Sequence, residues 1–478
     1  MRSDCWSEKH PLTADVDNIY GPLEARVPDA NTELRVISSY DTDYDTGAKW
    51  AFVFLWLFTV TVLGRPEDYF KIPFHFQLIF ATCAGLTFIA ALLTGRTRLV
   101  FSSELGLMLL LTVWFSLGVL FAYWHSASFS LLVGRWLRTL LVFFLLVQIL
   151  RGVNRIRKLM WGVVLSEAVV AFASVVLEGG EVLRKGERLE GFNADMLGWN
   201  YFPIAFAMTI PYIAVLYVSR RSWQRTLILA LAVSVMMWML VLTASRGGFL
   251  NVSFAVLLTW WCVLYGTERG RVAGIAIISI LIIAMILAPG LFMQRIRTIW
   301  GGSTLADDNV ISSADESVES RERVLSRSIM YTLRYPVFGV GMGNFSVING
   351  QELKVPNAWY GTHNTFTQLS SETGLPGLFL FLSLLLTSIK HMRKIRSRAD
   401  PGPDEIELYL FSRATIASIL SFVFGAFFAH LGYELFIYLP MAIASSLWIT
   451  AQEGVRLAGH APEDIPATRD EAEENKWS

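Results

Sequence analysis

The polar segment of residues 320–377 holds the side chains best suited to chemistry. It contains a single histidine, His363, and opens with Arg321 as its second residue. A neutral imidazole can take a proton from a hydroxyl near pH 7, and the planar guanidinium of arginine binds two phosphate oxygens at once. Two shorter polar segments add Arg188, in RLEGF, and Arg246, in TASRGGF. These residue types predict a general base beside cations that bind phosphate.

Each of these residues also has a plainer interpretation. An isolated arginine near a bilayer often reaches lipid phosphates, and a histidine is often only a polar contact. The position of His363 favours the base, because Asn364 beside it can cap a helix and the positive end of a helix dipole keeps the ring neutral. Glu372 follows about two helical turns later, where it either orients a partner or simply faces water.

Charged residues also lie inside apolar runs of the chain. Arg135 and Arg138 are three residues apart and so share one face of a helix. A charge at membrane depth is costly unless it is paired or hydrated, and Glu167 is a candidate counter-ion. Two interpretations stay open. One is a buried Glu167–Arg138 pair that fixes helix packing, and the other is a polar cavity that Arg135 lines near the outer surface.

The elements that must position these residues are membrane helices. The chain has 478 residues, of which 54% are hydrophobic and 17% charged, with a mean hydropathy of +0.46. Soluble domains carry about a quarter charged residues, so the composition predicts an all-α integral membrane protein. Apolar runs long enough to span a bilayer give about 12 transmembrane helices, at residues 48–64, 72–94, 104–123, 130–150, 159–178, 201–219, 226–244, 248–266, 272–293, 375–391, 406–428 and 432–451.

Basic residues orient these spans. With the N-terminus in the cytoplasm, the short internal loops hold 16 Lys and Arg residues and the opposite short loops hold six. The positive-inside rule favours this orientation and places the long loop between spans nine and ten outside the cytoplasm. The chain then divides into an acidic, disordered cytoplasmic tail (1–47), spans one to nine (48–293), the large loop (294–373), spans ten to twelve (374–451) and a second cytoplasmic tail (452–478).

The large loop has two predicted parts. Residues 301–319 are polar and acidic, which indicates a mobile segment rather than a metal site, because no ligand spacing repeats. From Ser320 onward an amphipathic helix at the membrane interface is expected, with Pro336 ending it and an apolar stripe made by Leu325, Ile329 and Leu333.

Three glycines follow this helix, at positions 339, 341 and 343. They are similar to a dinucleotide fingerprint, but no strand–turn–helix unit precedes them, so tight turns are the better interpretation. A second helix is expected to start near Asn364 and to end or kink at Gly374 and Pro376.

Several classes of function are excluded by what the sequence lacks. The three cysteines are far apart and suggest neither a disulfide framework nor a zinc site. Residues 1–49 have no apolar core and hold ten acidic against five basic residues, unlike a signal peptide. No basic stripe interleaved with aromatic residues suggests nucleic-acid binding. No cofactor and no metal are expected.

Spaced motifs cover about 190 residues of the chain. Arg321 is followed fifteen residues later by a P-x-x-G-x-G turn at 336–341, then by H-N-x-F at 363–366 and E-x-G-x-x-G at 372–377. Upstream lie T-x-S-R-G at 243–247 and R-x-x-G at 188–191, with Asn200 beyond it. This pattern resembles the O-antigen ligase and polymerase family, bacterial membrane glycosyltransferases that use lipid-linked glycans. Leu325 departs from it, because the family has an aromatic residue there.

The resemblance implies an inverting, metal-independent glycosyltransferase of the inner membrane, with its site facing the periplasm. The donor would be a glycan on undecaprenyl diphosphate, and the acceptor would be a lipid A core or another glycan. His363 would be the general base. Arg246 and Arg321 would hold the diphosphate as catalytic residues, with help from Arg188. The further candidates for binding the diphosphate or the glycan are Arg135, Asn364 and Glu372.

Two alternatives remain. An O-antigen or exopolysaccharide polymerase shares these residues, and no sequence feature decides between it and a ligase, which the resemblance modestly favours. A transporter or flippase with an outward basic vestibule is an alternative of another class. Transporters tend to carry internal repeats and broken helices at the membrane middle, and no convincing repeat is present here.

Overall fold

A computed structural model gives the architecture of the chain. It describes residues 46–64, 76–95, 97–185, 201–219, 222–265, 308–354, 361–395 and 403–458, with a few single residues between these ranges. Within them every regular element is helical: α2 (Thr46–Gly64), α4 (Phe76–Leu93), α5 (Ser103–Leu120), α6 (His125–Leu131), the π-helix η1 (Leu132–Trp136), α7 (Leu137–Ile149), α8 (Val153–Leu177), α9 (Gly179–Lys185), α11 (Tyr201–Ser219), α12 (Trp223–Thr243), α13 (Arg246–Thr259), the π-helix η2 (Trp260–Leu264), α16 (Asp308–Arg334), α17 (Phe345–Leu353), α18 (Thr365–Lys394), α19 (Pro403–Gly425) and α20 (Leu435–Ala458). The predicted all-α class is confirmed.

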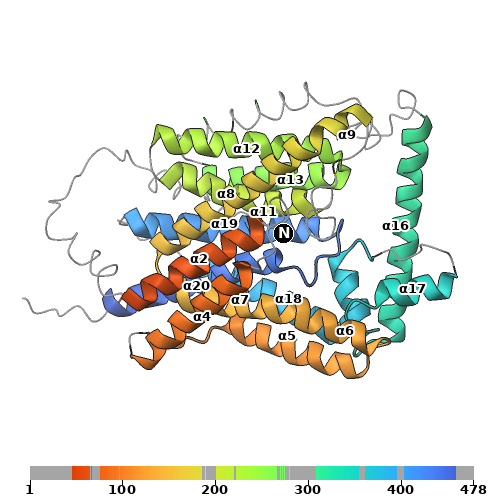
Figure 1. The fold of residues 1–478 in the computed structure, drawn as a ribbon, viewed down its shortest axis with the longest axis horizontal. Coiled ribbons are helices and arrows are strands. Elements are labelled where there is room, and N and C mark those ends of the chain that lie inside the picture. Colours follow the sequence, from red (N-terminus) through yellow and green to blue (C-terminus); the bar gives the residue numbers. More distant parts are fainter. Residues whose placement is uncertain are drawn as a thin grey trace, which may run out of the picture.

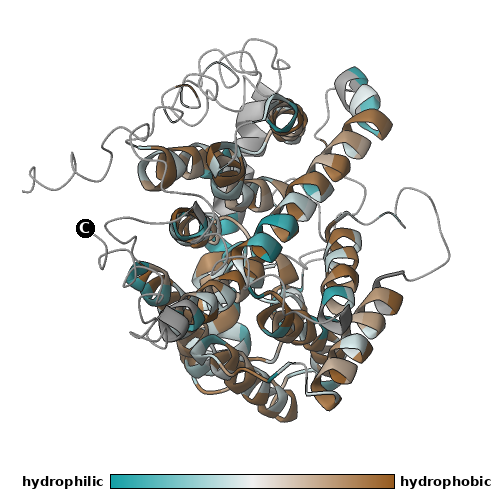
Figure 2. Ribbon diagram, turned by 90° about the vertical axis from the view of Figure 1, so that its left-hand side faces the viewer, coloured by the Kyte–Doolittle hydropathy of each residue, from teal (hydrophilic) through white to brown (hydrophobic). Residues whose placement is uncertain are grey.

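The helices are those of a multi-pass membrane protein. Nine of those described are long and apolar enough to cross a bilayer, and Lys49–Gly64 and Ile79–Leu93 are shorter apolar helices. Hydrophobic residues cover most of their length (Figure 2). These helices coincide with eleven of the predicted spans. Only single residues of the remaining predicted span, 272–293, are described, so a total of twelve stays a prediction. The predicted second tail is wrong for residues 452–458, which continue α20, and the rest of both tails stays a prediction.

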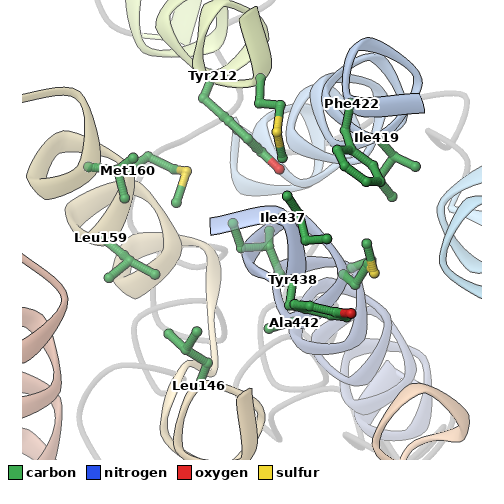
Figure 3. Packing of buried hydrophobic residues seen from close by; sticks show 14 of the residues in the cluster. Leu146, Leu159, Met160, Tyr212, Ile419, Phe422, Ile437, Tyr438 and Ala442 are labelled. Carbon is green, nitrogen blue, oxygen red and sulfur yellow. The ribbon is translucent and has the colours of Figure 1, made fainter. Parts of the chain in front are cut away.

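The core of the bundle lies where α8, α11, α19 and α20 meet (Figure 3). Tyr212 of α11 and Tyr438 of α20 are buried there, and the Tyr212 hydroxyl donates to Thr415 Oγ1 over 3.2 Å. Near the starts of their helices, Arg157 of α8 and Glu407 of α19 form a buried ion pair. Apolar packing and satisfied polar groups therefore hold the same helices together.

Helix α16 runs across the ends of the bundle helices rather than along them (Figure 1). It begins at Asp308, so the predicted mobile segment was wrong for residues 308–319. The reason lies in the sequence: residues 308–334 contain no glycine or proline, and the acidic residue at the start suits the positive end of the helix dipole. The predicted end before Pro336 is confirmed.

One face of α16 packs on the protein and another does not. Val324, Ser328 and Tyr331 are buried. The predicted apolar stripe, Leu325, Ile329 and Leu333, is instead 38%, 47% and 75% exposed. An exposed apolar stripe on a helix lying across the bundle is compatible with the membrane interface, and this placement stays a prediction.

The glycine turn after α16 docks onto a kink in α18. Gly374 has φ +74° inside α18, which frees two carbonyls of the preceding turn. Val340 N–H donates to the carbonyl of Ser371 over 2.8 Å, and Gly341 N–H donates to that of Glu372 over 2.9 Å. A side chain at Gly339 would collide with the α18 backbone. The predicted tight turns and kink are thus confirmed, and they form one joint between α16 and α18.

Candidate functional site

Four helix N-termini surround the segment 426–434, which connects α19 to α20. Thr365, the first residue of α18, donates its N–H to the carbonyl of Ala426 over 2.8 Å and its hydroxyl to that of Ala429 over 2.7 Å. Gly247 of α13 lies so close to Phe428 that an added Cβ would be 3.1 Å from the ring. Tyr201 opens α11 and contacts His430, and α20 begins directly after the segment. Helix N-termini carry partial positive charge, so this end of the bundle favours an anion.

His363 lies at the start of α18 in a strained conformation. Its φ is +50°, in the left-handed region that a non-glycine residue seldom adopts. Asn364 caps the helix, as predicted, since its Oδ1 accepts from the N–H groups of Phe366 (2.9 Å) and Thr367 (3.1 Å). The cap occupies this oxygen and fixes the neighbouring backbone.

The imidazole of His363 is neutral at pH 7. Its ring centroid lies 5.6 Å from that of His430. Burial, then His430 and then the charge of Arg321 lower the pKa of His363 from 6.5 to about 4. The lowered pKa agrees with the predicted neutral ring, although burial rather than the helix dipole is its largest cause.

Arg246 and Arg321 make up the first flank of the site, because the charge of Arg321 acts on His363 and that of Arg246 acts on Arg321. Arg246 is the first residue of α13, where Ser245 caps the helix by accepting from Gly248 N–H over 3.1 Å. Arg321 comes from α16. Burial and then the charge of Arg246 lower the pKa of Arg321. A cation at a helix N-terminus beside a second cation opposes the local electrostatics, so helix stability does not explain this pair.

A second polar group, next to His430, makes up the second flank of the site. Arg135 Nη1 and Glu434 Oε1 form an ion pair of 2.7 Å. The Tyr201 hydroxyl and His430 Nε2 are 2.9 Å apart. Burial and then the charge of Arg135 lower the pKa of His430 to about 4. Arg321 thus acts on His363, whereas Arg135 acts on His430.

Glu372 does not face water. It is 5% exposed, and its carboxylate accepts from Gly343 N–H (2.9 Å), Phe345 N–H (3.4 Å) and the Tyr433 hydroxyl (2.8 Å). These partners belong to the glycine turn, α17 and the segment 426–434. The alternative that Glu372 faces water is therefore wrong. Glu372 ties the turn to α18, and its part in binding the substrate stays a prediction.

The proposed pair of Glu167 and Arg138 was wrong. Glu167 accepts from the Thr209 hydroxyl over 2.8 Å, and Arg138 donates to the carbonyl of Gly134 and is exposed. Arg135 lies within the π-helix 132–136, and a π-helix breaks the regular helical spacing. The two arginines have different partners: Arg135 binds Glu434, and Arg138 binds the Gly134 carbonyl.

Arg188 lies outside the described residues, as do Gly191 and Asn200. The next residue, Leu189, is described and buried, and its N–H donates to the carbonyl of Leu242 over 3.0 Å. Leu242 is four residues before Arg246. The role of Arg188 stays a prediction.

Sequence reasoning missed Tyr201, His430 and Glu434. Their signal was present in AHLGYE, a histidine and a glutamate between two apolar runs on the predicted outer side. That loop was predicted as only the residues 429–431, too short to suggest a site. Tyr201 is the first residue of the predicted span 201–219, so its type and position suggested only a membrane helix.

The arrangement supplies a neutral base, a first flank with two cations, and a second flank with two polar pairs. Among the described residues no group of three or more His, Cys, Asp or Glu side chains is placed to hold a metal ion. The chemistry that these side chains can do is proton removal next to a bound anion.

Comparison with known families gives one match. Residues 231–382 match the family described as O-antigen ligase. The matched region runs from α12 to α18 and contains Arg246, Arg321 and His363. It excludes Arg135, and the segment 426–434 lies beyond it. No curated protein matches the chain.

Proposed function

Because residues 231–382 belong to the O-antigen ligase family, we propose that this membrane protein transfers a glycan from undecaprenyl diphosphate to an acceptor hydroxyl, most simply as an O-antigen ligase. One observation carries the proposal. His363 is held neutral and strained between the capped start of α18 and a pair of arginines.

The reaction is a single displacement. The acceptor oxygen attacks the anomeric carbon while His363 takes its proton. The bond between the anomeric carbon and the diphosphate oxygen breaks, and its electron pair leaves with the lipid diphosphate. One displacement inverts the anomeric centre.

Arg246 and Arg321 hold the diphosphate. Their mutual repulsion is relieved when an anion binds between them, and their charges stabilise the negative charge that grows on the leaving oxygen. Arg188 assists from the preceding loop. Two guanidinium groups can do this work without a divalent cation, so the activity is expected to survive EDTA.

The site is proposed to face the periplasm of a bacterial inner membrane. The basic asymmetry of 16 to six residues supports this orientation. Single cysteines at positions 313 and 397 test it with an impermeant thiol reagent on intact spheroplasts. Labelling of Ser313→Cys alone is expected, and labelling of Ser397→Cys alone would reverse the topology.

Ligase and polymerase differ in the acceptor. A ligase would transfer to a lipid A core, and a polymerase to a new repeat unit. A transporter or flippase makes no covalent product, and the strained, neutral His363 beside the arginines favours the enzyme over it. Neighbouring genes for core glycosyltransferases would support the ligase, whereas a flippase and a chain-length regulator would support the polymerase.

The deciding experiment replaces His363 by alanine. Purified protein in detergent receives undecaprenyl-diphosphate glycan and acceptor, and product is scored by gel shift. Wild type should give product, and His363→Ala should bind donor but lose about 10²–10⁴ in rate. His125→Ala is the matched control. His125 is on the same end of the bundle, and its Nε2 lies within hydrogen-bonding distance (3.2 Å) of the Leu120 carbonyl rather than of a residue of the site. Equal product from wild type and His363→Ala would remove His363 from the mechanism.

A further inference from the structure

The second flank of the site, which adjoins His363 through His430, has no role in the mechanism above. It is built by the Arg135–Glu434 ion pair of 2.7 Å and by Tyr201 and His430, 2.9 Å apart. These side chains come from η1, the start of α11 and the segment 426–434. Their convergence from three separate parts of the chain beside the proposed base indicates a built site.

Charge distinguishes the two flanks. Arg246 and Arg321 add two positive charges beside helix N-termini. On the other flank the charges of Arg135 and Glu434 offset each other, and the lowered pKa of His430 keeps its ring neutral at pH 7. A neutral polar group therefore fits the second flank without an uncompensated charge.

The second flank also holds a buried polar atom without a partner in the described part of the chain and a partly exposed guanidinium group. His430 Nδ1 is buried and finds no hydrogen-bond partner among the described residues. The side chain of Arg135 is 38% exposed, so its guanidinium is not enclosed by the ion pair. Buried polar atoms are normally satisfied, and an unsatisfied one beside a reacting centre points to a ligand group.

Close packing fixes the orientation of this ring. An added Cβ at Gly361 would lie 2.7–2.9 Å from Cε1, Nε2 and Nδ1 of His430, so only glycine fits there. Gly361 lies two residues before His363, and its contact with the ring ties the start of α18 to the second flank. The imidazole is thereby preorganised rather than free to rotate.

We infer that Arg135, Tyr201, His430 and Glu434 form the acceptor subsite, which binds a sugar residue without phosphate or carboxylate and presents its hydroxyl to His363. Guanidinium, carboxylate, phenol and imidazole groups offer the mixed donors and acceptors that sugar hydroxyls require. The inference rests on the proposed transferase function. It adds the class of the acceptor residue, which the ligase and polymerase alternatives leave open.

Steady-state kinetics test the subsite. The donor is lipid-linked glycan extracted from the producing cells, and the acceptor is a glycolipid extract from a strain that lacks this protein. Rates are measured over a grid of both substrates. Glu434→Gln and Tyr201→Phe should raise the acceptor KM by about tenfold or more and change the donor KM by less than about twofold, whereas Arg246→Lys should weaken the donor side.

Two controls guard against a folding defect. Glu352→Gln alters a glutamate that binds Arg327 over 2.6 Å near the same end of the bundle, and it should leave the acceptor KM unchanged. Tyr201→Phe removes only one hydroxyl, so it carries the test if Glu434→Gln fails to give monodisperse protein. Tandem mass spectrometry of the product should place the new linkage on an uncharged sugar residue.

The outcomes separate the subsite from the function. Wild-type product with an unchanged acceptor KM in both variants overturns the subsite and leaves the transferase intact. A new linkage on a phosphorylated or carboxylated residue does the same. No product from wild type overturns both proposals.

Discussion

Replacing Gly374 by alanine should displace Arg321 from His363 without changing any side chain of the site. Gly374 has φ +74° and ψ 177°, a region almost restricted to glycine. An added Cβ would lie well inside 3.0 Å of the Val337 carbonyl, a distance that real Cβ atoms do not reach. The turn that begins at Pro336 must therefore move away from α18.

The magnitude follows from the bonds across this joint. Three backbone hydrogen bonds join the turn to α18: Leu375 N–H to Pro336 O (2.8 Å), Val340 N–H to Ser371 O (2.8 Å) and Gly341 N–H to Glu372 O (2.9 Å). Their loss at about 1 kcal/mol each, with about 1–3 kcal/mol of backbone strain, gives a destabilisation of about 4–6 kcal/mol.

Activity should decrease when this joint between the turn and α18 is disrupted. Arg321 lies on α16, before the turn, and His363 lies at the start of α18, after it. A displacement of about 1 Å between such groups can cost about 10²-fold in rate. The assays are the melting temperature of the purified protein and glycan transfer in detergent. Both should decrease in Gly374→Ala.

Gly106→Ala is the matched control for this substitution. Gly106 is inside α5 and has no neighbouring atom within 4 Å of an added Cβ. Alanine there should be neutral or stabilise the helix by up to about 1 kcal/mol. Wild-type activity and melting temperature in Gly374→Ala would refute the claim that the joint positions Arg321 against His363.

Three further predictions concern the site itself. Arg246→Lys and Arg321→Lys should each lose about 2–4 kcal/mol of transition-state stabilisation in kcat/KM, because a point charge does not replace a planar fork, and near-wild-type rates would make both arginines structural. Asn364→Ala should lower stability by about 1 kcal/mol in thermal unfolding through loss of the cap, and an unchanged melting temperature would contradict this. His363 and His430 have folded pKa values of about 4 against 6.5 unfolded, so they stabilise fully above pH 6.5. As the pH falls from 6.5 towards 4, the unfolded chain binds a proton at each of these histidines before the folded chain does. Each histidine should therefore lower the free energy of unfolding by about 1.4 kcal/mol per pH unit, and His363→Gln should halve the part of this slope that the two histidines contribute.

The sequence was sufficient for the helices because hydrophobic length reports membrane spans directly. It was also sufficient for Asn364 as a cap and for Pro336 as a helix end, since both act on their immediate neighbours. The early start of α16 was not predicted, because the polar and acidic composition of residues 301–319 is typical of disorder, although the residues after Asp308 also suit a helix.

The pairing of charges could not be predicted, because it depends on tertiary contacts. Arg135 meets Glu434 across 299 positions of sequence, and no spacing rule reaches that far. The π-helix that carries Arg135 has no clear sequence signature. The burial of Glu372 could not be predicted either, because its three partners come together only when the glycine turn is folded onto α18.

The segment 426–434 makes the start of α18 depend on a late part of the chain. Arg246 and Arg321 are translated long before this segment. Thr365 binds the carbonyls of Ala426 and Ala429, so these two bonds at the start of α18 can form only after residues 426–429 have been translated. A chain that ends before residue 426 would contain both arginines but would lack the bonds that hold the residue two positions after His363. If the proposed function is correct, glycan transfer is therefore expected only from chains that extend beyond residue 429.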